Sequence, residues 1–232
     1  MSSKTFPSLS LEQELFNSGF EFVIGIDEVG RGCLFGPVAV GVAVLQASVH
    51  SEKSDWPAKL CDSKLINEKV REELFEPVGS WVSGYAVGMA SAAEIDELGI
   101  TKCLSLAAER AVRELPQEIR GAIATDPTKA KAILDGSHNW LGSALGPVAS
   151  MVRTKADRDC VSVAAASVLS KVTRDRLVVE IASIDESLTP YGIAGNKGYS
   201  SSGHLAALRE FGPTELHRKT WLHKILAQDE LF

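Results

Sequence analysis

The stretch that decides the fold runs from Val23 to Gly32 and reads VIGIDEVGRG. An apolar run typical of a buried strand ends in two adjacent carboxylates, Asp27 and Glu28, and a Gly-Arg-Gly turn follows at once. Burying a carboxylate is costly unless an opposite charge compensates it, and a divalent cation is the natural compensation. Because successive strand residues point to opposite faces, the two acids reach one site only where the strand ends and frays.

The turn itself suggests what else the site binds. Gly30 and Gly32 allow backbone N–H groups to approach a bound group closely, and Arg31 between them suits a phosphate. The turn is neither a Walker loop nor a GxGxxG motif, and no Ser-His-Asp or Cys-His arrangement competes convincingly. The stretch therefore predicts a site for metal and phosphate.

Composition sets the broad class. The chain has 232 residues, of which 45% are hydrophobic and 23% charged, enough for one domain with a good core. Its four cysteines lie far apart without a CxxC pair, which favours reduced thiols: Cys33, Cys61, Cys103 and Cys160. The N-terminus does not resemble a signal peptide, and the longest apolar run, 33–45, is too short to span a bilayer. We expect a soluble, cytoplasmic, monomeric protein that does not bind membranes.

The net charge of −6 is not typical of a protein that binds nucleic acid through an overall positive charge. Basic residues nevertheless crowd two segments, 153–176 and 217–224. Each one alone is best interpreted as solvated surface. Together with the acids, they predict a local basic rim around a metal site, with binding that depends on metal and salt.

The pattern along the chain is α/β. We predict strands over 23–26, 38–45, 82–89, 132–134 and 148–153. Helices are predicted over 67–75, from a capping box at 91–94 to Gly99, over 104–115 and over 162–180. Two more follow Gly203, separated by Gly212-Pro213. Without an internal repeat or long linker, residues 1–232 are expected to form one catalytic domain with 203–232 as a C-terminal helical extension.

The motif GIDEVGRG resembles the signature of the type 2 ribonuclease H family (ribonuclease HII). Further likenesses follow in the family's order over roughly residues 20–220. They are Asp62-Ser63-Lys64, Leu134-Asp135-Gly136, Lys155-Ala156-Asp157 followed by 163–167, Asn196-Lys197-Gly198-Tyr199 with His204, and Gly212-Pro213-Thr214 before His217-Arg218. The resemblance implies a ribonuclease H-like fold, a mixed five-stranded sheet flanked by helices.

The resemblance also implies the catalytic residues. Four carboxylates act as catalytic groups and as ligands of two divalent cations, Mn²⁺ or Mg²⁺, and they match Asp27, Glu28, Asp135 and Asp157. From the residues alone, Asp135-Gly136 is equally a common turn, and an Asp before a helix is a common cap. Asp159 competes with Asp157, and the Lys-x-Asp match favours Asp157.

Substrate-binding residues are implied in the same way. The backbone of Gly30, Arg31 and Gly32 reads the ribose 2′-hydroxyl and its flanking phosphate, Lys64 holds a phosphate, and Tyr199 stacks on the sugar beside the RNA–DNA junction. Some positions depart from the family pattern and put the fit of these loops in question. They are Ser200-Ser201-Ser202 in place of Gly-Thr, and Cys33 and Phe35 where Pro and Ala are more usual.

The implied activity is that of a metal-dependent endoribonuclease. It hydrolyses the RNA strand of RNA–DNA hybrids and incises 5′ of ribonucleotides embedded in duplex DNA, leaving 3′-hydroxyl and 5′-phosphate ends. The nearest alternative is type 3 ribonuclease H, which usually has an extra N-terminal domain and Gly-Thr-Gly in the turn. A binding module without turnover is another, but four retained acids argue against it.

The chain ends in Gln228-Asp229-Glu230-Leu231-Phe232. A terminal Gln-x-x-Leu-Phe resembles the peptide by which replication and repair proteins dock into an apolar pocket of a sliding clamp. The alternative is a tail whose Leu231 and Phe232 fold back onto the core.

Overall fold

A computed structural model describes residues 6–226, which are built around a five-stranded sheet in the order β3-β2-β1-β4-β5. β1 (Phe22–Val29) pairs antiparallel with β2 (Val38–Gln46), and β2 pairs antiparallel with β3 (Gly84–Ala90). On its other side β1 pairs parallel with β4 (Ala130–Asp135), and β4 pairs parallel with β5 (Ala149–Arg153). The predicted mixed five-stranded sheet is confirmed.

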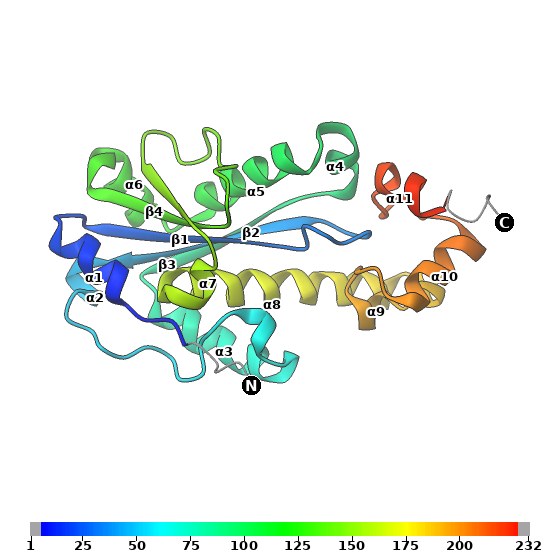
Figure 1. Cartoon of the computed structure of the whole chain (residues 1–232), viewed down its shortest axis with the longest axis horizontal. Coiled ribbons are helices and arrows are strands. Elements are labelled where there is room, and N and C mark those ends of the chain that lie inside the picture. The colour runs from blue at the N-terminus through cyan, green and yellow to red at the C-terminus, as the bar shows by residue number, and fades with distance from the viewer. Residues whose placement is uncertain (1–5, 227–232) are drawn as a thin grey trace.

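Helices cover both faces of this sheet (Figure 1). On one side lie α4 (Ala92–Leu98), α5 (Ile100–Glu114) and α6 (Gln117–Thr125), and on the other α3 (Glu68–Trp81), α7 (Ala156–Asp159) and α8 (Val161–Ile184). The shorter α1 (Ser10–Asn17) and α2 (Ala47–His50) lie at one end of the sheet. The opposite end is formed by α9 (Ile193–Asn196), α10 (Ser202–Phe211) and α11 (Lys219–Leu226). Short 3₁₀ turns span Ser63–Leu65, Pro127–Lys129 and Glu186–Tyr191.

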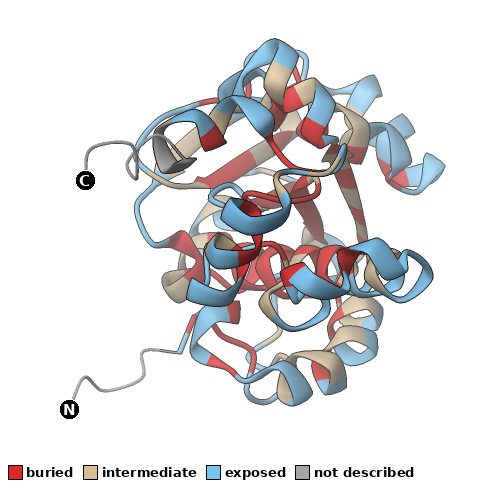
Figure 2. Cartoon of the chain, turned by 90° about the vertical axis from the view of Figure 1, so that its right-hand side faces the viewer, coloured by how far each residue is buried: buried red, intermediate tan, exposed pale blue. Residues whose placement is uncertain are grey.

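The central strand is buried on both faces because its alternate residues enter two different cores. Ile24 and Ile26 pack into the cluster around α5, whereas Val23 packs into the cluster around α8. Figure 2 shows the buried residues on the sheet and on the helix sides that face it. Gly25 lets α8 approach β1 unusually closely, because a Cβ added at this position would lie 2.2 Å from the carbonyl carbon of Ser162. The alanines of α8 complete this close approach.

The N-terminus of α8 is fixed by a buried acid from α1. One carboxylate oxygen of Glu12 accepts hydrogen bonds from the backbone N–H and the hydroxyl of Ser162, both at 2.8 Å. Burial raises the pKa of Glu12, and the hydrogen bonds from the helix start offset part of this effect. Glu12 thereby attaches the first helix of the chain to the longest one.

The C-terminal elements form a third apolar cluster against the loop that follows the Gly-Arg-Gly turn. Leu34 and Phe35 of that loop pack with Val178 of α8, with Tyr191 and with Leu222 of α11. The tail helices are therefore part of the packing that supports the turn.

Several element boundaries differ from the predictions. The capping box of Ser91 and Glu94 is confirmed, but α3 continues through Pro77 to Trp81 instead of ending at Phe75. Leu74 and Val78 are buried on either side of that proline, so tertiary packing outweighs the lost hydrogen bond. Helix α6 was not predicted at all, because its short segment buries only Ile119 and presents little periodicity.

Three further observations concern the helices, the cysteines and the C-terminal peptide. Among the helices of residues 6–226, none is both long enough and apolar enough to cross a membrane. The four cysteines are separate buried thiols. The predicted docking peptide, Gln228–Phe232, lies outside the described residues.

Candidate active site

The first pair of acids lies where two parallel strands separate. The ladder between β1 and β4 ends at the pair Ile26–Leu134, and the next residues along the two strands are Asp27 and Asp135. β1 itself continues to Val29, still paired with β2, so the strand frays only on its β4 side. Parallel strands bring their carboxyl ends to the same edge of a sheet, and this topology places the two acids together.

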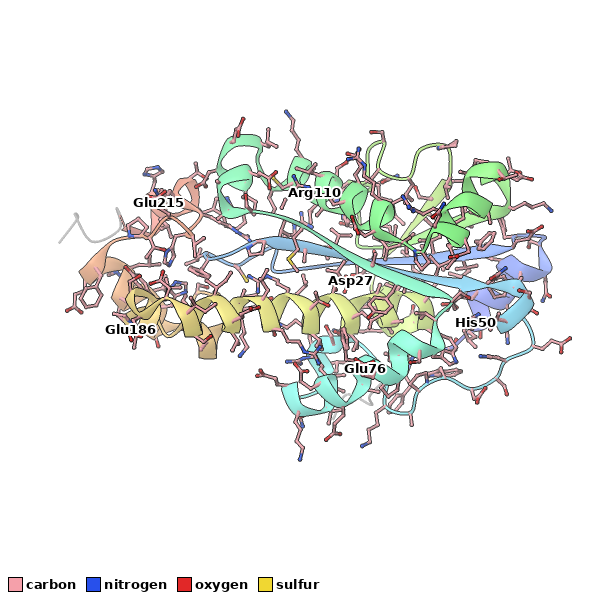
Figure 3. All side chains as sticks on the ribbon, turned by 180° about the vertical axis from the view of Figure 1, so that it is seen from behind. Asp27, His50, Glu76, Arg110, Glu186 and Glu215 are labelled. Carbon is pink, nitrogen blue, oxygen red and sulfur yellow. The ribbon has the colours of Figure 1, made fainter. Side chains whose placement is uncertain are left out.

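Asp27 is a buried carboxylate, 3% exposed, and lies between the sheet and α8 (Figure 3). Burial raises its pKa well above the ordinary value, and the neighbouring charges of Glu28 and Asp135 raise it further. A hydrogen bond with Ser167 of α8 and the charge of Lys64 act in the opposite direction. The fold therefore holds this acid in a position that disfavours its charge.

Glu28 has one oxygen bound and one oxygen unsatisfied. Oε1 pairs with the Arg31 guanidinium at 3.2 Å, while Oε2 is buried without a hydrogen-bond partner among the described residues. Burial raises the pKa of Glu28, although Arg31 lowers it. A buried carboxylate oxygen without a donor is costly, and it indicates a missing positive partner.

Asp135 fixes the position of Asp157, the fourth predicted acid. Its Oδ1 accepts a hydrogen bond of 2.7 Å from the backbone N–H of Ala156, which fixes the start of α7 at the end of β4. Asp157, the next residue, is buried, and burial followed by the charges of Asp62 and Asp135 raises its pKa to about 7. Asp159 instead pairs with Arg153 at 2.8 Å on the surface. The structure thus groups Asp157, not Asp159, with the other acids.

Lys64 supplies the positive charge among these four acids. Burial favours its neutral form, but the charges of Asp27, Asp157, Asp62 and Asp135 outweigh this effect and raise its pKa. As they stand, no three acidic, histidine or cysteine side chains of residues 6–226 converge closely enough to coordinate a single ion. The acids interact through their charges without forming a closed set of ligands.

Asp62 is a site residue that the sequence reasoning missed. It is 1% exposed, accepts the backbone N–H of Lys64 at 2.8 Å and pairs with the Nε of Arg158 at 3.1 Å. It therefore fixes the turn that carries Lys64. Its presence in the Asp-Ser-Lys element was a signal, but an Asp beside a Ser is common in turns and does not by itself reveal burial.

The Gly-Arg-Gly turn is held from behind by a buried guanidinium. Arg218, 0% exposed, donates hydrogen bonds to the carbonyls of Gly30 at 2.7 Å, Arg31 at 2.8 Å and Gly36 at 3.2 Å. These carbonyls consequently point inward. Burial lowers the pKa of Arg218 to about 10.

A second buried arginine, Arg174 of α8, extends the same support. It donates to the carbonyls of Phe35, Pro37 and Lys197 at 2.8 to 3.1 Å. Gly30 has a φ of +74°, and a Cβ there would lie 2.2 Å from the Nε of Arg174, so only glycine fits at this position.

The prediction of a basic rim was therefore wrong for its central members. Arg174 and Arg218 are 0% exposed and bind backbone carbonyls instead of facing solvent. Of the others, Arg153, Arg158 and Arg176 are paired with carboxylates at 2.6 to 3.1 Å. Charge along a sequence does not reveal which cations the tertiary fold buries.

Tyr199 lies beside this turn. Its ring is stacked on the ammonium of Lys171, 5.1 Å from the ring centre, and the residue is 39% exposed. Burial raises the pKa of Tyr199 to about 12, and the neighbouring Cys33, whose thiol donates to the carbonyl of Lys197 at 3.7 Å, raises it further. The backbone N–H of Leu34 donates to the carbonyl of Gly198 at 2.8 Å, which joins the tyrosine loop to the turn.

The comparisons with known proteins agree with this arrangement. The family model for Ribonuclease HII matches residues 24–224. A Ribonuclease HII from Streptomyces griseus is 42% identical over 220 residues, which cover 94% of this chain and 84% of that protein.

Two solved structures are also similar. The crystal structure of the ribonuclease H2 from Pyrococcus horikoshii OT3 has a TM-score of 0.64 and 25% identity, covering 91% of this chain and all of that one. The structure of the PCNA:RNase HII complex from Archaeoglobus fulgidus has a TM-score of 0.62 and 25% identity, covering 86% and 93%. With the acids at the strand ends, the Gly-Arg-Gly turn and a family match over most of its length, the chain belongs to the ribonuclease HII family.

Proposed function

We propose that this ribonuclease H uses divalent metal ions to cut the RNA strand of hybrids and to incise 5′ of single ribonucleotides embedded in duplex DNA, leaving 3′-hydroxyl and 5′-phosphate ends. Family membership makes the protein a hydrolytic endonuclease of RNA–DNA hybrids. The metal ions, the single-ribonucleotide substrate and the end chemistry are the proposal. The observation that carries it is the buried Oε2 of Glu28, which has no hydrogen-bond partner among residues 6–226, in a group of acids of which Asp27, Glu28 and Asp157 have raised pKa values.

The chemistry of these side chains fits such ions. Asp27, Glu28, Asp135 and Asp157 offer only oxygen ligands, which suit Mn²⁺ or Mg²⁺ better than zinc. Burial raises the pKa of Asp27, Glu28 and Asp157, so the charge on each of these three is unfavourable and a cation would relieve it. A bound pair of ions would supply an activated water and stabilise the leaving 3′ oxygen.

The remaining residues bind and orient the substrate. With its carbonyls held inward by Arg218, the turn Gly30–Gly32 can present backbone N–H groups to a ribose 2′-hydroxyl and its phosphate. Lys64 stands among the acids, where it can pair with the scissile phosphate. The exposed part of the Tyr199 ring can stack on the sugar next to the junction. The earlier expectations of a cytoplasmic location and a monomeric state remain predictions.

The test is cleavage of an end-labelled DNA duplex that contains one ribonucleotide, with Mg²⁺, with Mn²⁺ and with a chelator. We expect one cut on the 5′ side of the ribonucleotide and none with the chelator, because the acids need cations to act on a phosphodiester. The matched control is an all-DNA duplex of the same sequence, which should stay intact. Failure to cut with either ion, or equal cutting of the control, would contradict the proposal.

We also propose that the C-terminal peptide Gln228–Phe232 binds a sliding clamp. Support comes from the peptide's likeness to clamp-docking motifs and from the similar Archaeoglobus fulgidus structure, which is a PCNA:RNase HII complex. Two apolar side chains and a Gln amide in one short segment are suitable for an apolar pocket with a polar rim.

Deleting Leu231 and Phe232 is expected to remove clamp binding while leaving cleavage of short oligonucleotides unchanged, because the acids and the turn lie elsewhere in the chain. Binding is measured by titrating immobilised clamp with full-length and truncated protein, and stability by thermal unfolding. If the full-length protein does not bind, or if the truncation lowers the unfolding temperature by many degrees, the two residues pack on the core instead.

A further inference from the structure

Two buried histidines in the tail have no part in the proposed chemistry. His204 of α10 and His217 before α11 are 0% and 1% exposed, and their Nε2 atoms lie 3.0 Å apart. Aromatic neighbours surround them: His217 packs on Phe35 and Tyr191, with ring centres 5.1 and 4.9 Å away. Burial lowers the pKa of His204, and it lowers that of His217 to about 4, so both are neutral at physiological pH.

The hydrogen-bond partners determine where each proton resides. The Nδ1 of His204 is 2.8 Å from the carbonyl of Tyr199, and because a carbonyl only accepts, this nitrogen carries the proton. A neutral imidazole has one proton, so the Nε2 of His204 is an acceptor. The proton between the two rings therefore belongs to the Nε2 of His217.

The hydrogen bonds between His217 and Thr214 give the same assignment of protons independently. The Nδ1 of His217 accepts from the backbone N–H of Thr214 at 3.0 Å and lies 2.8 Å from the Thr214 hydroxyl. An N–H only donates, so this nitrogen carries no proton. The result is one directed relay in which Thr214 donates to His217, His217 to His204, and His204 to the carbonyl of Tyr199.

The relay ends on the residue that is proposed to read the junction. The Lys171 ammonium beneath the ring holds the side chain of Tyr199. Its backbone N–H donates to the carbonyl of Asn196 at 3.0 Å, and its carbonyl accepts the backbone N–H of Ser201 at 2.8 Å. His204 adds a side-chain hydrogen bond to the same carbonyl and so connects this loop to the tail. At the opposite end the relay starts four residues before Arg218, which supports the Gly-Arg-Gly turn. The tail is thus joined to both substrate-reading elements.

We propose that His204 and His217 are positioning residues, whose directed hydrogen-bond relay fixes the backbone of Tyr199 and thereby sets the preference for a single embedded ribonucleotide over a long hybrid. This inference rests on the proposed role of Tyr199 at the junction. A long hybrid offers many registers to the site, whereas a single ribonucleotide offers one junction. An imprecisely held Tyr199 therefore affects the single ribonucleotide more.

The relay itself is tested without any activity measurement. Long-range ¹H–¹⁵N NMR spectra of the full chain report which ring nitrogen of each of its five histidines is protonated. We expect the Nδ1–H tautomer for His204 and the Nε2–H tautomer for His217. Identical tautomers, or a doubly protonated ring at neutral pH, would overturn the relay.

The positioning role is tested by two isosteric variants of one residue. In His204→Asn the amide can take the place of Nδ1 and still donate to the Tyr199 carbonyl, but it loses the contact with His217. In His204→Gln the amide can take the place of Nε2 and keeps the hydrogen bond with His217, but it loses the hydrogen bond to the Tyr199 carbonyl, which then accepts only from the backbone N–H of Ser201. Both variants lose one buried hydrogen bond, so their unfolding temperatures should fall by similar amounts.

We expect only the Gln variant to lose selectivity. Its kcat/KM at a single ribonucleotide should fall about tenfold more than its kcat/KM on a long hybrid, the loss expected for one hydrogen bond. The Asn variant should keep the wild-type ratio, and Tyr199→Ala provides the reference for complete loss of the contact. Equal ratios in the Asn and Gln variants would overturn the positioning role. A wild-type protein that cleaves neither substrate would instead contradict the proposed function.

Discussion

Asp27→Asn is expected to reduce cleavage of both substrates by at least about 1,000-fold, which corresponds to roughly 4 kcal/mol of transition-state stabilisation. The amide keeps the shape of the side chain but removes a negative charge from the proposed metal ligands. Single-turnover cleavage rates at saturating Mg²⁺ and Mn²⁺ measure the loss. The same variant should bind substrate nearly as well as the wild type, because the Gly-Arg-Gly turn and Tyr199 remain in place.

Asp27→Asn should lower activity, but it should preserve or increase the stability of the fold. Burial and the neighbouring acids raise the pKa of Asp27, so the folded state disfavours its charged form and is destabilised by it above the ordinary pKa of an Asp. A neutral Asn removes this penalty. Without added metal, the unfolding temperature of Asp27→Asn should therefore equal or exceed that of the wild type.

The matched control is Asp159→Asn. This residue is also acidic and lies two positions beyond Asp157, but it pairs with Arg153 on the surface, where such pairs contribute little. Its cleavage rate should stay close to that of the wild type. An inactive Asp159→Asn together with an active Asp157→Asn would show that the fourth ligand has been wrongly assigned.

Arg218→Met is expected to lower the free energy of unfolding by about 3 to 5 kcal/mol. The change removes the guanidinium hydrogen bonds to the carbonyls of Gly30, Arg31 and Gly36. The aliphatic part of the side chain is preserved, so the loss reflects the hydrogen bonds more than the packing. Urea unfolding at neutral pH measures it, and the slope with urea should remain that of the wild type.

Two controls separate burial from charge. Arg176→Met removes an arginine of α8 that is half exposed and paired with Glu72, and it should cost less than about 1 kcal/mol. Arg218→Lys keeps a cation but replaces the planar fork by one ammonium, which cannot reach the same three carbonyls, so it should resemble the Met variant. A loss below about 1 kcal/mol in Arg218→Met would show that the turn holds its conformation without the arginine.

The sequence pattern predicts five strands and a first pair of acids, and the resemblance to the ribonuclease HII family implies the mixed sheet and the full set of four acids. Apolar runs that lead into Asp27-Glu28 and Asp135-Gly136 mark two strands, although β1 continues past its acids to Val29, and the order of elements predicts five strands between helices. These signals are local, because strand periodicity and the cost of burying a carboxylate depend on residues close in the chain. The ordered series of motifs identified the family for the same reason.

Only the tertiary structure decided which residues support those acids and the turn beside them. Asp62 and Arg158, Arg218 and Gly30, and His204 and His217 are partners across 13 to 188 positions of the sequence. In the sequence Arg174 and Arg218 are indistinguishable from surface arginines, and His204 from any helix histidine. Burial decides their roles, because a guanidinium or an imidazole removed from water must find its partners within the protein. Which backbone carbonyls and rings are within reach is determined by the packing of the tail on the loop after the turn.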